Sequence, residues 1–290
     1  MIKLIASDMD GTLLNAEMQI SEENVAAIRY AQSQGIEFMV ATGRNRAEAL
    51  PPLTQAGIEC AMITLNGAQV FDKAGNSLFS APIEQTVVQK TLALLDEHEI
   101  YYEIATNEGI YTANKEQRIE NFASAIAEMM PHLTYNMAIA MSVARLDFFP
   151  IHIVEDLHEL VMRDDLSVLK IICFHKEGAK RLGPVAKEID AFGDLAVTSS
   201  GQNNIEINHR NAQKGIAVSH VANDRQIPLS EVMTIGDNLN DVSMLQAAGV
   251  SFAMGNGLPE VKEYAKYVTE TNIESGVGKA IRRAIDENLA

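Results

Sequence analysis

Residues 1–80 alternate short apolar runs with helix-like segments, and this order constrains the fold more than any other feature of the chain. We expect buried strands over 2–7, 36–41 and 60–65, because each is a short apolar run bounded by turn residues. Between the first two, Ser21 is placed to cap a helix that Gly35 closes. Strands that alternate with helices form parallel sheets with right-handed crossovers, so the sequence predicts an α/β fold.

The same pattern is interrupted and then returns. A second helical stretch is expected to break near Pro51 and Pro52, and a hairpin is expected over 68–83 around residues 73–76. Strand candidates then follow at 100–106, 168–174, 195–199 and 204–207. After residue 209 we expect a helix from about Ala212, strands at 232–236, 250–254 and 267–269, and helices over 239–248, after Pro259 and from Val277.

The simplest architecture is a doubly wound, Rossmann-like parallel-sheet core with an inserted α/β cap domain. The core comprises residues 1–82 and 210–290, and the cap comprises residues 83–209. Each part is long enough to bury a hydrophobic core of its own.

The net charge of the chain excludes some classes of binding partner. The chain carries 23 basic and 39 acidic residues, a net charge of −16, so it repels nucleic-acid phosphates and anionic lipid. We therefore expect no nucleic-acid or membrane partner.

Cys60 and Cys173 lie in apolar runs and are typical of buried thiols in a reducing compartment. Without a charged-then-apolar leader before the first strand, a cytoplasmic location is expected. Nothing in the sequence indicates an oligomeric state.

Acidic residues follow two of the predicted strands. Asp8 and Asp10 come after the first strand, and Asp237 and Asp241 follow strand 232–236. Taken singly, such residues are ordinary turn and cap residues. Together they would meet at the carboxyl edge of one sheet, where ligands of open α/β folds bind. Crowded carboxylates repel each other unless a cation lies among them, and oxygen ligands of this kind suit Mg²⁺.

Two further segments suit a phosphate group. Thr42 and Gly43 end the second strand and offer a hydroxyl and backbone N–H groups, although a plain strand-to-loop turn is the better explanation of these two residues taken alone. Lys214 lies at a predicted helix start, where a cation is disfavoured unless it faces an anion or solvent. Combined with the carboxylates, these groups predict magnesium-assisted phosphoryl transfer. One aspartate would attack phosphorus, and the other would exchange protons with the leaving group and water.

Four of these segments resemble the ordered motifs of the haloacid dehalogenase-like superfamily. They are residues 8–14 (DMDGTLL), 41–44 (ATGR), 214–215 (KG) and 236–241 (GDNLND). The long insertion between the second and third motifs resembles the type-two cap of the Cof-type phosphatases. Residues 65–68, 253–256 and 272–278 are similar to further signatures of that branch.

The resemblance implies a role for each matching residue. Asp8 would be the nucleophile that forms an aspartyl phosphate and also a metal ligand, and Asp10 would be the general acid–base, with its backbone carbonyl on Mg²⁺. Asp237 would bind the metal and Asp241 would orient the ligands from behind. Thr42 and Lys214 would act on the phosphate in catalysis. The wider set that would contact phosphate or substrate is Asp8, Gly11, Thr42, Gly43, Arg44, Asn66, Lys214 and Asn240, with Arg44 and Asn66 toward the cap.

The function that the resemblance implies is a Mg²⁺-dependent phosphatase for small phosphorylated metabolites, such as sugar phosphates or flavin mononucleotide. The cap would select the leaving group. Two alternatives stay open: a phosphomutase or phosphotransferase that hands the phosphoryl group to a second hydroxyl, and a non-catalytic phosphate-sensing module.

Overall fold

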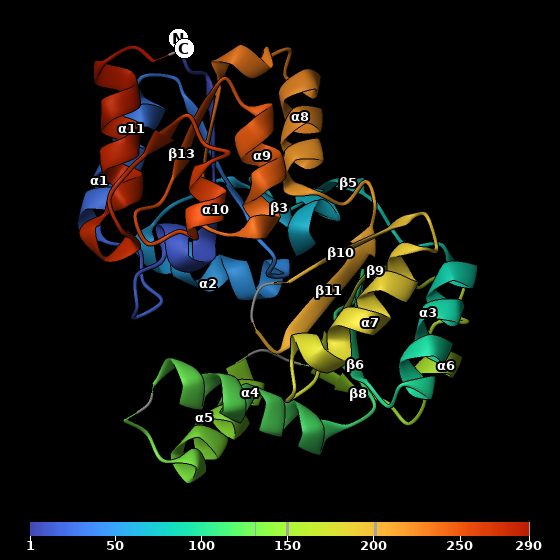
Figure 1. Ribbon diagram of the computed structural model, residues 1–290. Coiled ribbons are helices and arrows are strands. Elements are labelled where there is room, and N and C mark those ends of the chain that lie inside the picture. The colour runs from blue at the N-terminus through green and yellow to red at the C-terminus, as the bar shows by residue number, and fades with distance from the viewer. Residues whose placement is uncertain (131, 149–150, 200–201, 290) are drawn as a thin grey trace. The chain divides into compact units, whose positions relative to one another are not determined.

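A computed structural model of the protein describes residues 1–130, 132–148, 151–199 and 202–289 (Figure 1). The chain forms two compact units. The first, the core, comprises Met1–Ala81 and Asn211–Ala290, and the second, the cap, comprises Pro82–Arg210. Each junction lies one residue from the boundary drawn from the sequence. Both chain ends belong to the core.

The core is built on an eight-stranded sheet in the order β14-β13-β12-β1-β2-β3-β4-β5. The strands from β14 to β3 are parallel, and β4 and β5 add an antiparallel hairpin. The predicted α/β parallel-sheet core is therefore confirmed. The strand bounds are β1 (Leu4–Ser7), β2 (Glu37–Ala41), β3 (Ala61–Thr64), β4 (Gln69–Phe71), β5 (Ser77–Ser80), β12 (Val232–Gly236), β13 (Val250–Ala253) and β14 (Tyr267–Val268).

Helices cover both faces of this sheet, which is why the central strands are apolar on both sides. One face packs against α1 (Glu22–Ser33), α2 (Arg46–Ala56) and α11 (Gly276–Asp286), and the other against α8 (Lys214–Asp224) and α9 (Val242–Ala247). Figure 1 shows α1 and α11 together on one side and α8 and α9 on the other. The remaining short elements of the core are α10 (Pro259–Lys262), η1 (Met9–Leu13), η2 (Leu65–Gly67), η3 (Leu229–Glu231), η4 (Leu239–Asp241) and η5 (Asn272–Glu274).

Two helix predictions differ from the structure. Helix α2 continues through Pro51 and Pro52, so the predicted break is wrong. Asn45 caps its start, and Pro52 leaves the carbonyl of Glu48 without a helical N–H donor, but that carbonyl accepts a hydrogen bond from Arg44 Nη1 at 3.1 Å instead. The single helix expected over 239–248 is split into η4 and α9, because Asn238 and Asp241 form a capping box there.

The cap has a six-stranded sheet in the order β10-β11-β9-β6-β7-β8. Its pairings are antiparallel except for β7 with β8. The strands are β6 (Tyr101–Thr106), β7 (Ile110–Thr112), β8 (Ile151–Ile153), β9 (Val168–Phe174), β10 (Leu195–Thr198) and β11 (Asn204–His209), and the helices are α3 (Gln85–Glu97), α4 (Lys115–Met129), α5 (Tyr135–Phe148), α6 (Leu157–Leu160) and α7 (Ala179–Asp190).

The two faces of the cap sheet differ in chemistry. One face is apolar and packs against α3, α6 and α7. The other carries buried charges, among them the ion pair of Lys170 and Glu206 at 2.8 Å and the pair of Glu103 with Arg118 of α4. No helix in the described part of the chain is both long enough and apolar enough to cross a membrane.

A substitution at Asn24 tests how helix α11 is held against the rest of the core. This buried side chain donates from Nδ2 to the carbonyl of Leu13 at 3.3 Å and accepts from the N–H of Gly278 at 2.7 Å. We expect Asn24→Ala to lower the free energy of unfolding by about 1–3 kcal/mol, because it leaves buried backbone groups unpaired. Denaturant unfolding measures this, with the exposed Asn223→Ala as control. Equal effects of the two substitutions would contradict the assignment.

Candidate active site

The candidate site lies where three adjacent parallel strands end. In the order β12-β1-β2, Asp237 follows β12, Asp8 follows β1 and Thr42 follows β2. The N–H of Asp8 donates to the carbonyl of Ile235 at 2.9 Å, which continues the ladder by one residue and fixes the two loops side by side. The predicted edge of the sheet therefore carries these residues.

A buried lysine joins two carboxylates at this edge. Lys214 Nζ donates to Asp8 Oδ1 at 2.5 Å and to Asp241 Oδ1 at 2.6 Å, and all three residues are buried. One ligand oxygen from each of Asp8, Asp237 and Asp241 lies within 4.8 Å of the others. Residues separated by more than 200 positions in sequence thus form one cluster of charges.

Close packing of two helices brings Lys214 to Asp241. Lys214 is the first residue of α8, and its neighbour Gly215 faces the start of α9. A Cβ on Gly215 would lie 2.2 Å from the carbonyl oxygen of Ser243, so only glycine allows this approach. The N–H of Gly215 also donates to Ser243 Oγ at 3.0 Å. Lysine at this helix start therefore faces anions, which is one of the two interpretations that the sequence left open.

Asp241 is held on both of its oxygens. While Oδ1 accepts from Lys214, Oδ2 accepts from the backbone N–H groups of Asp237 at 2.9 Å and Asn238 at 3.1 Å. These bonds fix the loop that carries Asp237. The contacts suit a residue that orients the cluster from behind.

Asp237 is oriented by the loop after β1. Thr12 Oγ1 donates to Asp237 Oδ1 at 2.7 Å. Gly11 lies beside the same carboxylate with φ of 77°, and a Cβ there would be 2.5 Å from Asp237 Oδ2. Asn256 Nδ2 fixes this turn by donating to the carbonyl of Gly11 at 2.8 Å. Sequence reasoning assigned no role to Thr12 or Asn256, although both lie in segments that carried the resemblance.

Burial and mutual repulsion raise the proton affinity of the cluster. Burial raises the pKa of Asp8 well above its usual value, Lys214 opposes this, and Asp241 and Asp237 raise it further. Burial and the charge of Asp241 raise the pKa of Asp237 to about 6. Lys214 is the opposite case: burial lowers its pKa, but Asp241 and Asp8 outweigh that and raise it.

The donor set fits a divalent cation. Three carboxylates face one lysine, and in the part of the chain that the structure describes, Asp8 Oδ2 and Asp237 Oδ2 accept no hydrogen bond. Carboxylate oxygens are the ligands that hard divalent cations such as Mg²⁺ and Ca²⁺ prefer.

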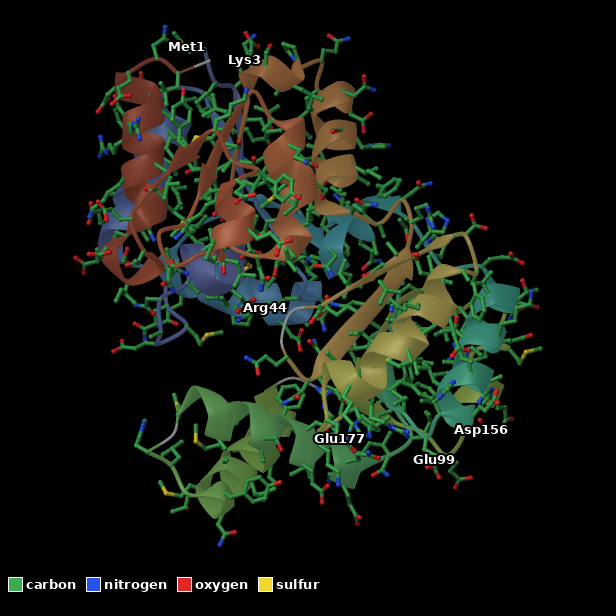
Figure 2. The ribbon with its side chains drawn as sticks, viewed as in Figure 1. Met1, Lys3, Arg44, Glu99, Asp156 and Glu177 are labelled. Atoms are coloured by element: carbon green, nitrogen blue, oxygen red, sulfur yellow. The ribbon has the colours of Figure 1, made fainter. Side chains whose placement is uncertain are left out.

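Arg44 contacts the other predicted carboxylate. Its Nε donates to Asp10 Oδ2 at 2.7 Å and its Nη2 to Asp10 Oδ1 at 2.5 Å. The two side chains therefore form a bidentate ion pair, which we call the fork. Figure 2 labels Arg44 in the core. The Asp10 side chain is 51% exposed and that of Arg44 13%. The predicted orientation of Arg44 toward the cap stays a prediction.

The loop after β2 is tied to the loop after β3. Thr42 Oγ1 accepts from the N–H of Arg44 at 3.2 Å, and the carbonyl of Thr42 accepts from the N–H of Asn66 at 3.0 Å. Asn66 Oδ1 in turn accepts from Asn240 Nδ2 at 3.2 Å. Gly43 lies between Thr42 and Arg44 in the same loop. The predicted phosphate-binding residues are thus linked to the carboxylate loop through Asn240.

Comparison with known proteins identifies the family. A model of the haloacid dehalogenase-like hydrolases matches residues 5–281. The chain belongs to this family. It is 34% identical to the phosphatase YwpJ of Bacillus subtilis over 98% of this chain and all of that protein. It is 32% identical to the 5-amino-6-(5-phospho-D-ribitylamino)uracil phosphatase YcsE of B. subtilis, covering 97% and 95% of the two chains.

A solved structure agrees over both units. A haloacid dehalogenase-like hydrolase from B. subtilis matches with a TM-score of 0.87 and 33% identity, covering 97% of this chain and 99% of that one. The predicted membership of the family is therefore confirmed, and so is the predicted enzyme class: the protein is a phosphatase, a hydrolase of phosphoric monoesters.

Lys214 tests the electrostatic account of the site. Lys214→Met leaves the buried Asp8 without its cation, so we expect the free energy of unfolding in chelator at pH 7.5 to fall by about 3–5 kcal/mol. Lys214 lowers the pKa of Asp8 in the folded protein, so without it the folded variant binds a proton at higher pH than the wild type does, and the deficit shrinks as pH falls. Unfolding at pH 7.5 and 5 measures this, with exposed Lys279→Met as control. A deficit independent of pH would contradict the account.

Proposed function

We propose that the protein hydrolyses phosphomonoesters of small metabolites with Mg²⁺, through an aspartyl phosphate on Asp8. The observation that carries this proposal is the buried cluster in which Lys214 lies 2.5 Å from Asp8 and 2.6 Å from Asp241. A carboxylate that is fixed and paired with a cation at a strand end is positioned to attack a bound phosphorus atom.

The reaction balances with two aspartates. An Asp8 oxygen forms a bond to phosphorus while the bond from phosphorus to the leaving oxygen breaks, and Asp10 gives that oxygen a proton. Water then attacks the phosphorus of the aspartyl phosphate and passes a proton to Asp10. The acyl phosphate bond breaks, and Asp8 and inorganic phosphate are restored.

The neighbouring residues would hold the phosphoryl group. The hydroxyl of Thr42, the N–H groups near Gly11 and Gly43, the ammonium of Lys214 and the amide of Asn240 supply hydrogen-bond donors at this edge. Such preorganised donors stabilise the charge that builds up on the equatorial oxygens.

The carboxylates of Asp8 and Asp237 and the backbone carbonyl of Asp10 would hold Mg²⁺, with Asp241 orienting them through the N–H of Asp237. When bound, the ion neutralises charge on the phosphate oxygens. The unequal hydrogen bonding supports this division, because both oxygens of Asp241 are engaged while Asp8 and Asp237 keep one oxygen each without a partner among the described residues.

We propose that the cap recognises the leaving group of the substrate, because one face of the cap sheet is rich in buried charge. Sugar phosphates, flavin mononucleotide and phosphorylated ribityl compounds are the proposed substrate class; a relative that is 32% identical is named for a ribitylaminouracil phosphate. The free, buried thiols of Cys60 and Cys173 fit the expected cytoplasmic location. Phosphate release from a panel of such metabolites tests the proposal, and transfer to a second hydroxyl without release would favour the phosphotransferase alternative.

Asp10 argues against the phosphate-sensing alternative. A sensor needs a long-lived phosphoaspartate, whereas an acid–base group two residues from the nucleophile promotes turnover.

Asp8→Asn tests the nucleophile. We expect turnover to be abolished, because an amide does not attack phosphorus, while the chain keeps its fold. Lys214→Ala is expected to lower kcat by about 100- to 1000-fold, the scale for one lost electrostatic stabiliser. Steady-state phosphate release measures both variants. Wild-type rates for Asp8→Asn in a preparation free of other phosphatases would rule out the covalent route.

Metal binding is expected to depend on pH. Because the pKa of Asp237 is about 6, Mg²⁺ has to displace a proton below that pH, and its affinity is expected to fall by about tenfold or more per unit. Calorimetric titration with Mg²⁺ at pH 7.5 and 5, in buffers of different ionisation enthalpy, measures affinity and proton release. Equal affinity at both values with no proton release would contradict metal binding at Asp237.

A further inference from the structure

Arg44 is fixed on three of its atoms. Its Nε and Nη2 hold the two oxygens of Asp10, and its Nη1 donates to the carbonyl of Glu48 in α2 at 3.1 Å. The guanidinium plane is therefore determined from two sides: by the carboxylate that it holds and by the helix that holds it.

The carbonyl of Glu48 is available because of a proline. In an α-helix this carbonyl would accept from the N–H four residues later, which is position 52. Pro52 has no N–H, and a proline ring inside a helix clashes with the carbonyl four residues earlier, which here is that of Glu48. The adjacent Pro51 has the same effect on the carbonyl of Ala47, but Arg44 bonds only that of Glu48 among the described residues.

Stability alone does not explain the fork. Asp10 is half exposed, and ion pairs in water contribute little to folding. A two-pronged arginine–carboxylate contact instead fixes geometry, because it sets both the position and the plane of the carboxyl group. Position and plane are what a proton-transferring carboxyl group needs.

We infer that Arg44 is a positioning residue for Asp10, held in place by the Glu48 carbonyl that Pro52 leaves open. This inference rests on the proposed function, in which Asp10 serves as the acid–base. It differs from direct phosphate binding by Arg44, because it assigns the effect of Arg44 to the proton step.

The leaving group separates these two roles. Glycerol is a far weaker acid than p-nitrophenol, so glycerol 2-phosphate needs Asp10 to protonate the departing oxygen and p-nitrophenyl phosphate hardly does. A positioning role lowers kcat/KM for the first substrate selectively, because kcat/KM reports the steps up to departure of the leaving group; kcat also contains the later hydrolysis step, which is common to both substrates. If Arg44 instead binds the phosphate, its loss lowers kcat/KM by the same factor for both substrates, since both carry the same phosphate group.

The experiment measures kcat and KM for both substrates in the wild type and in Asp10→Asn, Arg44→Lys and Arg44→Ala. Asp10→Asn sets the scale, with a selective loss of kcat/KM of about 10²- to 10⁴-fold on glycerol 2-phosphate. In both Arg44 variants, kcat/KM on glycerol 2-phosphate is expected to fall about tenfold or more relative to that on p-nitrophenyl phosphate. Alanine removes the contact with Asp10, and lysine keeps the charge but not the fork. In the Asp10→Asn background, Arg44→Ala is expected to add no further selective loss.

Pro52→Ala tests the support from the helix, and Pro51→Ala is its matched control. An alanine at 52 restores an N–H that competes with Arg44 for the Glu48 carbonyl. We expect a selective loss of about two- to tenfold, the worth of one net hydrogen bond, and no selective loss for Pro51→Ala. Both variants place alanine, a helix-forming residue, in α2, and circular dichroism checks that they fold like the wild type.

The outcomes separate the inference from the proposed function. If the wild type releases no phosphate in Mg²⁺ from these two substrates or from the metabolite panel, the proposed function fails. If the wild type is active but the Arg44 variants lose kcat/KM equally on both substrates, or gain activity on glycerol 2-phosphate, the positioning role is wrong. If Pro52→Ala behaves like Pro51→Ala, the role assigned to the Glu48 carbonyl is wrong.

Discussion

The buried contact of Lys214 with Asp8 and Asp241 is the constraint on which the rest of the site depends. An ammonium group inside a protein is stable only beside anions, and two buried carboxylates are tolerable only beside a cation. The contact therefore fixes the start of α8 against the ends of β1 and β12. Once these are fixed, Asp237 follows through its N–H bond to Asp241, and Gly11 and Thr12 pack against Asp237.

The main elements of the core could be predicted because its strands are buried on both faces. Strand β12 has the predicted bounds, since it is an apolar run with sharp ends, and strand β9 of the cap has them as well. Cap strands β7 and β8 were not predicted, because three residues are too few to show a period. The course of α2 through Pro51 and Pro52 was also missed, since it depends on a bond from Arg44 that no local pattern reveals.

The members of the site could be predicted better than their contacts. Asp8, Asp237, Asp241 and Lys214 were identified because each follows a strand or begins a helix at the same edge. The fork between Arg44 and Asp10 joins two loops 34 residues apart, and the bond from Asn256 to Gly11 joins loops 245 residues apart. Such pairings follow from the packing of side chains in three dimensions and leave no trace in residue spacing.

The central claim is that Asp8 carries the phosphoryl group, and the most direct measurement traps it there. Asp10→Asn is suited to this because p-nitrophenol departs without acid help while hydrolysis of the intermediate lacks its base. After reaction with p-nitrophenyl phosphate and Mg²⁺, borohydride reduces an aspartyl phosphate to homoserine, which peptide mass spectrometry locates. The account predicts homoserine at position 8. Release of p-nitrophenol with homoserine at another position, or at none, would contradict it.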